Sequence, residues 1–256
     1  MRALGRLKPG WYLLVALVLY AVVASVGWRR DVVALRQLRL EVAGVEAEAV
    51  APAAVDAGAD ATATAPPPMA GDVGLWLPVP GVRIPSDDDH LPGAPRAYRA
   101  GTSEGFVFWP ESSGAFLGFG TPVIATGAGE VVRVDEPYTE LDAEAWDALL
   151  ADVADGATEA ELDRLRGRQV WIELDDGRVA RYGHLADVRA GLAVGQRIGR
   201  GRVIGFVGNS GTLDGVLGRT SNARLHFELR EGDGYVGAGL DPDGVRLLAS
   251  SLFTGP

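Results

Sequence analysis

The sequence contains no cysteine. Disulfide bonds, metal sites built from thiolates and a cysteine nucleophile are therefore excluded, although the compartment stays open because many exported bacterial proteins also lack cysteine. Basic residues are scarce beyond residue 40, where 17 Lys and Arg stand against 33 Asp and Glu. Such an acidic surface repels polyphosphates, so we expect no nucleic-acid partner.

The composition is otherwise that of a folded protein. Of its 256 residues 47% are hydrophobic, and 35 glycines indicate many turns. The length leaves room for a membrane segment, a linker and one domain of ordinary size.

A long uncharged run lies near the amino terminus. Residues 11–28, "WYLLVALVLYAVVASVGW", carry no charge over 18 positions, and a helix of this length spans roughly 27 Å, close to the hydrocarbon thickness of a bilayer. Aromatic residues stand at both ends, where amphipathic rings prefer the membrane interface. A cleaved signal peptide is the alternative, but Arg29 and Arg30 follow where a small-residue cleavage site is expected. The run therefore predicts one transmembrane helix over 11–28.

The segments around this helix define the expected organisation. Basic residues flank the helix on both sides, so the positive-inside rule does not fix its orientation. We assign residues 1–10 to a basic cytoplasmic end, 29–50 to a helical stalk and 51–72 to an Ala/Pro-rich linker. Apolar spacings of three and four in the stalk also fit a short coiled-coil contact.

The folded domain is expected over residues 73–256. Short apolar runs such as "GEVVRV", "RQVWIEL" and "RLHFELR" recur between glycine-marked turns, which favours an antiparallel sheet or sandwich. Helical spacing interrupts this pattern at about 138–166, where "TEAE" also has the spacing of a capping box. The expected fold class is therefore mainly β with a small helical insert.

Strand alternation predicts a polar groove. Over "ARLHFELR" the apolar side chains fall on one face and Arg224, His226, Glu228 and Arg230 on the other. The same rule applied to "GRVARYGHL" places Tyr182 and His184 together. The side chains expected to line the groove are Tyr182, His184, Arg224 and His226.

Four stretches, in this order, carry a resemblance: "TPVIATGAGEVVRV", "RYGHL", "GFVGNSGTLDG" and "LHFELR". Together they resemble the lysostaphin/LytM-type zinc endopeptidases that cut peptidoglycan cross-bridges, over roughly residues 92–231. The resemblance implies a LytM-like β-sandwich (a duplicated hybrid motif) and a location outside the cytoplasmic membrane, facing the cell wall.

The resemblance also locates a zinc site, and there the sequence departs from the family. Members hold zinc with a histidine, an aspartate four residues later and the second histidine of a His-x-His. Ser103 and Val107 stand at the first two of these positions, so only His226 matches a ligand. Of the two catalytic histidines, one matches His184, while the other is replaced by Arg224.

These losses argue against zinc chemistry. A catalytic zinc needs about three protein ligands and a water, and Arg224 adds a fixed positive charge where a dication would bind. We therefore expect no metal and no cofactor, and we assign no catalytic residue. The alternative is a zinc metalloendopeptidase that uses substitute ligands.

Two other stretches resemble reactive sites more weakly. The carboxylates and imidazole of "SDDDH", Ser86 to His90, fit a metal site but fit a solvated turn better. Ser210 in "GNSGT" lacks the strained elbow and the ordered base of a nucleophilic serine, and its glycines indicate a turn.

The expected function follows from the degenerate site. Degenerate members of this family act as non-enzymatic regulators of wall hydrolases, so the expected partners are peptidoglycan or a cell-wall hydrolase, with the membrane contacted through residues 11–28. A structural role within a membrane complex through residues 11–50 is a further alternative. Arg224 is expected to take over the missing metal charge, by pairing with a nearby carboxylate or by binding a peptide carboxylate. The insert is expected to cover the groove edge or to bind a partner.

Overall fold

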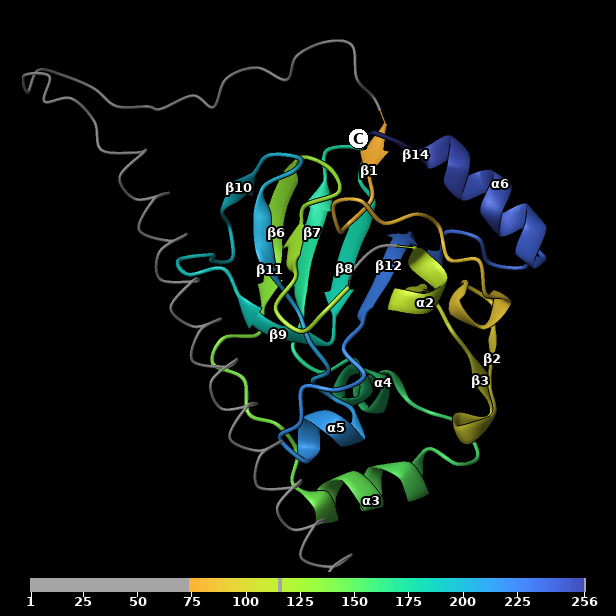
Figure 1. Ribbon diagram of the computed structural model, residues 1–256, viewed down its shortest axis with the longest axis vertical. Coiled ribbons are helices and arrows are strands. Elements are labelled where there is room, and N and C mark those ends of the chain that lie inside the picture. The colour runs from red at the N-terminus through yellow and green to blue at the C-terminus, as the bar shows by residue number, and fades with distance from the viewer. Residues whose placement is uncertain (1–73, 115–116, 256) are drawn as a thin grey trace, which may run out of the picture. The chain divides into compact units, whose positions relative to one another are not determined.

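The computed structural model in Figure 1 describes residues 74–114 and 117–255, all within the compact unit Met69–Pro256. The transmembrane helix, stalk and linker expected over 11–72 lie outside the described residues. Within the described ranges, no helix combines the length and the apolar character needed to cross a membrane.

A seven-stranded sheet forms the framework of the domain (Figure 1). Its strands run in the order β10-β6-β7-β8-β12-β13, β4 also pairs with β12, and every pairing is antiparallel. Their bounds are β4 Phe106–Phe108, β6 Gly129–Val134, β7 Val170–Leu174, β8 Val179–Gly183, β10 Arg197–Ile198, β12 Leu225–Glu231 and β13 Gly234–Tyr235. The predicted antiparallel, mainly β fold is thus confirmed.

A second, three-stranded antiparallel sheet completes the core. Its order is β5-β11-β9, with bounds β5 Pro122–Ile124, β9 Leu185–Val188 and β11 Val203–Val207. Buried side chains of both sheets, such as Ile172 and Phe227 from the large one and Ile204 from the small one, join one hydrophobic cluster. Burying one face of each sheet in this way requires the period-two alternation seen in the sequence.

The helical insert consists of α3 (Ala143–Asp152) and α4 (Glu159–Arg166) between β6 and β7. Asp142 caps α3, and the predicted capping box is present at the start of α4, where Thr158 and Glu161 each satisfy the other's backbone N–H. The insert has a small core of its own, built from Trp146, Leu149, Val153 and Leu165. This core fixes the two helices against each other at one end of the large sheet.

The remaining elements surround this framework. They are β1 (Leu75–Trp76) paired in parallel with β14 (Phe253–Gly255), β2 (Pro95–Arg96) paired with β3 (Gly101–Thr102), the helices α2 (Pro110–Ser113), α5 (Leu213–Val216) and α6 (Pro242–Leu252), and the 3-10 turns η1 (Asp88–His90) and η2 (Ala97–Arg99). Among these elements, the β2–β3 ribbon and α5 border the hollow described next.

Candidate functional site

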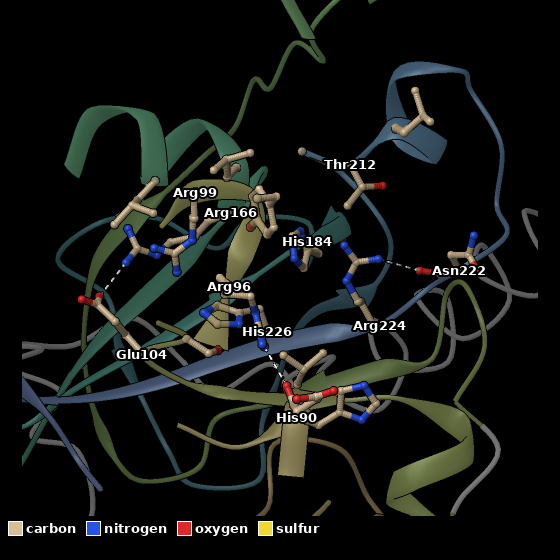
Figure 2. Close-up of a pocket in the computed structure, with 18 of the residues that line it drawn as sticks. His90, Arg96, Arg99, Glu104, Arg166, His184, Thr212, Asn222, Arg224 and His226 are labelled. Carbon is tan, nitrogen blue, oxygen red and sulfur yellow. Dashed lines mark hydrogen bonds and ion pairs between the residues drawn. The ribbon is translucent and has the colours of Figure 1, made fainter. Parts of the chain in front are cut away.

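A hollow of about 770 Å³ lies between β12, the insert, α5 and the β2–β3 ribbon (Figure 2). This volume falls in the range of small-molecule and peptide sites. Strand β12 provides its floor. Leu225, Phe227 and Leu229 point into the core and are at most 2% exposed, whereas Arg224, His226 and Glu228 line the hollow. The alternation predicted for this strand is therefore present.

Tyr182 does not lie where the sequence placed it. Its side chain is fully buried in the core, 5.3 Å from the ring of Phe227 between centroids, and its hydroxyl meets the backbone N–H and the hydroxyl of Thr126 at 2.9 and 3.0 Å. The reason is local. β8 ends at Gly183, and His184 has a left-handed backbone with φ 58°, so alternation does not carry across it. His184 thus reaches the hollow while Tyr182 stays in the core.

The buried phenol predicts a loss of stability in alkali. Burial raises the pKa of Tyr182 to about 12, although the Thr126 hydrogen bonds favour the phenolate, and the pKa of an unfolded tyrosine is about 10. Because the folded state holds the proton more tightly, this contribution is complete below pH ~10 and is lost as pH rises through 12. We expect the unfolding free energy to fall by up to ~3 kcal/mol over that interval. Urea unfolding of Tyr182→Phe should show a shallower fall, and an equal slope in both proteins would contradict this reading.

His184 is held as a neutral imidazole. Its Nδ1 donates to the carbonyl of Ser210 at 2.8 Å, because a carbonyl can only accept. Burial lowers the pKa of His184 well below its usual value, and the charge of Arg224 and the neighbouring His226 lower it further. With the proton on Nδ1, the lone pair of Nε2 remains available to accept a hydrogen bond. His184 therefore offers an acceptor beside the ring of His226, 6.0 Å away between centroids.

Glu228 is the centre of a buried ion-pair network. The carboxylate is 1% exposed and accepts from Arg166 Nε at 2.6 Å, while Arg181 lies at 3.5 Å and His226 Nε2 at 3.0 Å. Burial alone would raise the pKa of Glu228, but His226 and Arg166 outweigh it and hold the pKa well below its usual range. Arg166, the last residue of α4, also binds Glu104 at 3.0 Å. The network therefore ties the insert to the floor of the hollow.

The residues at the family's zinc positions do come together. Val107 is the direct cross-strand partner of His226, a position where side chains lie roughly 5 Å apart, and Ser103 lines the same hollow. The donor set does not fit zinc. Val107 has no lone pair, the Ser103 hydroxyl donates to the carbonyl of Gly105 at 3.0 Å, and His226 Nε2 is engaged by Glu228.

The two weaker candidates have structural explanations. Within 74–114 and 117–255 no group of three or more His, Asp or Glu side chains is placed to hold a metal. In "SDDDH", Asp87 caps the turn η1, Asp88 pairs with Arg246 at 2.5 Å, and His90 Nδ1 lies 2.7 Å from the hydroxyl of Ser112. Ser210 accepts from the backbone N–H of Arg168 at 2.9 Å, as a turn residue does.

Comparison with known proteins finds one family that is similar to part of the chain. Residues 147–238 match the model of peptidase family M23, a match that begins after Ser103 and Val107. None of the curated proteins matches the chain.

Several solved structures are similar to this chain. A zinc containing peptidase from Vibrio cholerae is 21% identical over 64% of this chain and 38% of its own, with a TM-score of 0.40, so this chain spans well under half of that protein. The catalytic domain of a variant of the prophage-encoded M23 protein EnpA from Enterococcus faecalis is 20% identical over 67% of this chain and 97% of its own, with a TM-score of 0.40. The catalytic domain of lysostaphin from Staphylococcus simulans is 19% identical over 57% and 82%, with a TM-score of 0.35.

The matched region contains β7, β8 and β12 together with His184 and His226 of the hollow. The chain is therefore similar to peptidase family M23 over residues 147–238.

Proposed function

We propose that the domain acts at the cell wall without hydrolysing it, as a regulator of a wall hydrolase or as a peptidoglycan-binding module. One observation carries the proposal: Val107, an apolar side chain, occupies the cross-strand position opposite His226. A ligand at that position is needed to complete the three-ligand set of a catalytic zinc. The family match supports a wall-related role, and residues 11–28 would anchor the domain on the outer side of the membrane.

The charge balance of the hollow supports the same conclusion. The carboxylate of Glu228, beside His226, is already neutralised by Arg166 and Arg181, and Arg224 brings a further positive charge close to His184. A dication bound beside His226 would be repelled by these arginines. The hollow remains intact, however, and a hollow of this size with polar groups on its floor suits a peptide ligand.

Zinc content and hydrolysis test the proposal together. The purified full-length protein, saturated with zinc and then freed of excess metal, should retain well under one zinc per chain. Incubated with insoluble peptidoglycan, it should release no soluble fragments, while co-sedimenting with the polymer or altering fragment release by an added wall hydrolase. Stoichiometric zinc together with fragment release by the protein alone would overturn the proposal and establish the alternative, a metalloendopeptidase with substitute ligands.

A further inference from the structure

Three guanidinium groups in the hollow have no carboxylate partner. Arg96, Arg99 and Arg224 all line it (Figure 2), yet within the described part of the chain no Asp or Glu oxygen lies within ion-pair distance of any of them. Their hydrogen bonds go to backbone carbonyls instead. Arg96 donates to Pro95 and Asp89 at 3.0 and 2.9 Å, Arg99 to Thr102, and Arg224 to Asn222 at 3.3 Å.

Four acidic side chains line the hollow. Asp89 acts on Arg96 through its charge and its backbone carbonyl, without an ion pair, and the other three are engaged elsewhere. Glu104 binds Arg166 at 3.0 Å and Arg230 at 2.7 Å, and Glu228 is held by the network described above. At the rim, Asp214 accepts from Asn222 at 2.5 Å and from Ser221 at 2.9 Å. In a domain with an excess of acidic residues, Arg96, Arg99 and Arg224 therefore lack an ion-pair partner among the described residues.

Arg224 is the most constrained of the three. Its guanidinium carbon lies 5.2 Å from the centre of the Trp109 ring, and its backbone N–H donates to Gly208 at 2.8 Å, so both ends of the residue are fixed. Burial lowers the pKa of Arg224, the charges of Tyr98 and Asp214 raise it, and the positive charge of Arg96 lowers it. Two guanidinium groups from distant segments thus repel each other across the hollow, an arrangement that an anion between them would relieve.

The insert adds apolar side chains to the lining of the hollow. They are Trp146, Leu150, Leu162 and Leu165. The occupant therefore needs an anionic group together with apolar or backbone surface, and the neutral His184 offers it a hydrogen-bond acceptor. A short peptide that ends in a carboxylate has this combination. A polyphosphate does not, and the acidic domain would repel it.

We propose that the hollow binds a peptide through its carboxylate, which is received by Arg224 together with Arg96 and Arg99 while the rest of the peptide lies along the insert. This inference rests on the proposed function, because a wall peptide is the ligand class that it names. Planar guanidinium groups bind carboxylates with two parallel hydrogen bonds, and at this site they take the place that a metal charge would fill in an active relative.

The test compares two forms of one ligand. Soluble peptidoglycan fragments, and the same fragments with their carboxylates converted to amides, are titrated into the full-length protein and followed by calorimetry. The native fragments should bind at least about tenfold more tightly than the amidated ones, since charge-assisted bonds are lost in the latter. Arg224→Gln and Arg96→Gln should each remove that preference. Arg224→Lys should retain only part of that preference, because lysine keeps the positive charge but cannot make two parallel hydrogen bonds to a carboxylate.

The control is Arg197→Gln, which removes an exposed arginine paired with Asp175 at 2.6 Å and should leave both affinities unchanged. Equal affinity for the two fragment forms, or an unaltered preference in Arg224→Gln and Arg96→Gln, would overturn the carboxylate site. Inorganic phosphate that competes as well as the native fragments would overturn the peptide assignment. Co-sedimentation with insoluble peptidoglycan separates the two proposals, because it survives if only the carboxylate site is wrong.

Discussion

The triple change Ser103→His, Val107→Asp and Arg224→His is expected to raise the zinc affinity of the protein by at least about 100-fold. The sheet already holds position 107 directly across from His226, and Ser103 lines the same hollow. Donors at these two positions would complete a three-ligand set, and the third change removes the positive charge. Competition against a chromophoric chelator, with metal analysis of the dialysed protein, measures the effect.

The matched control is Ser103→Ala, Val107→Leu and Arg224→Gln, which alters the same positions and removes the same charge without adding a ligand. Its zinc affinity should stay at the level of the parent. If the triple histidine–aspartate variant also fails to bind zinc, the hollow has been remodelled beyond these positions. The engagement of His226 Nε2 by Glu228 would then be the first contact to examine.

Glu228→Ala is expected to lower the unfolding free energy by about 3–5 kcal/mol. The carboxylate is 1% exposed and holds Arg166, whose side chain is only 8% exposed. Removing it takes the most buried counter-charge from Arg166, which keeps only the more exposed Glu104 and Glu159, and takes the carboxylate partner from Arg181. Such a loss is far more costly than that of a surface pair. Urea unfolding followed by tryptophan fluorescence measures the change.

Two further variants separate the buried pair from a general effect of charge. Arg197→Ala, at the exposed pair with Asp175, should cost no more than ~1 kcal/mol. The double change Glu228→Leu and Arg166→Met removes both partners, so it should recover much of the loss. If Glu228→Ala is no more destabilising than Arg197→Ala, the network contributes nothing measurable to stability.

The sequence predicts the parts of this structure that depend on local patterns. Alternation over 224–230 predicts which side chains of β12 lie on each face. The apolar side chains must face the core, and the period of two then places the polar side chains on the hollow. The capping box at Thr158 depends only on residues three apart, and it forms as expected. The positions that match the family's zinc site also meet in space, with Val107 across from His226.

The parts that depend on backbone reversals and on distant pairings could not be predicted in this way. Alternation placed Tyr182 in the groove because it assumed an extended chain through His184, whose φ of 58° breaks the strand. Nothing near Arg166 in the sequence indicates that its partner is Glu228, since the insert reaches that carboxylate only through the pairing order of the sheet. The grouping of Arg96 and Arg99 with Arg224 likewise arises from how the β2–β3 ribbon borders the hollow.

The position of Arg166 has a consequence for how the chain folds. Besides its ion pair with Glu159 inside the insert, Arg166 pairs with Glu104 and with Glu228, and each of these contacts spans 62 residues, one toward each end of the chain. Contacts of such sequence separation carry a large loop-closure cost and form only after more local pairings have been made. The insert helices and the β7–β8 hairpin are local, so we expect them to precede the docking of α4 on β12. The hollow should therefore assemble only after these local parts have formed.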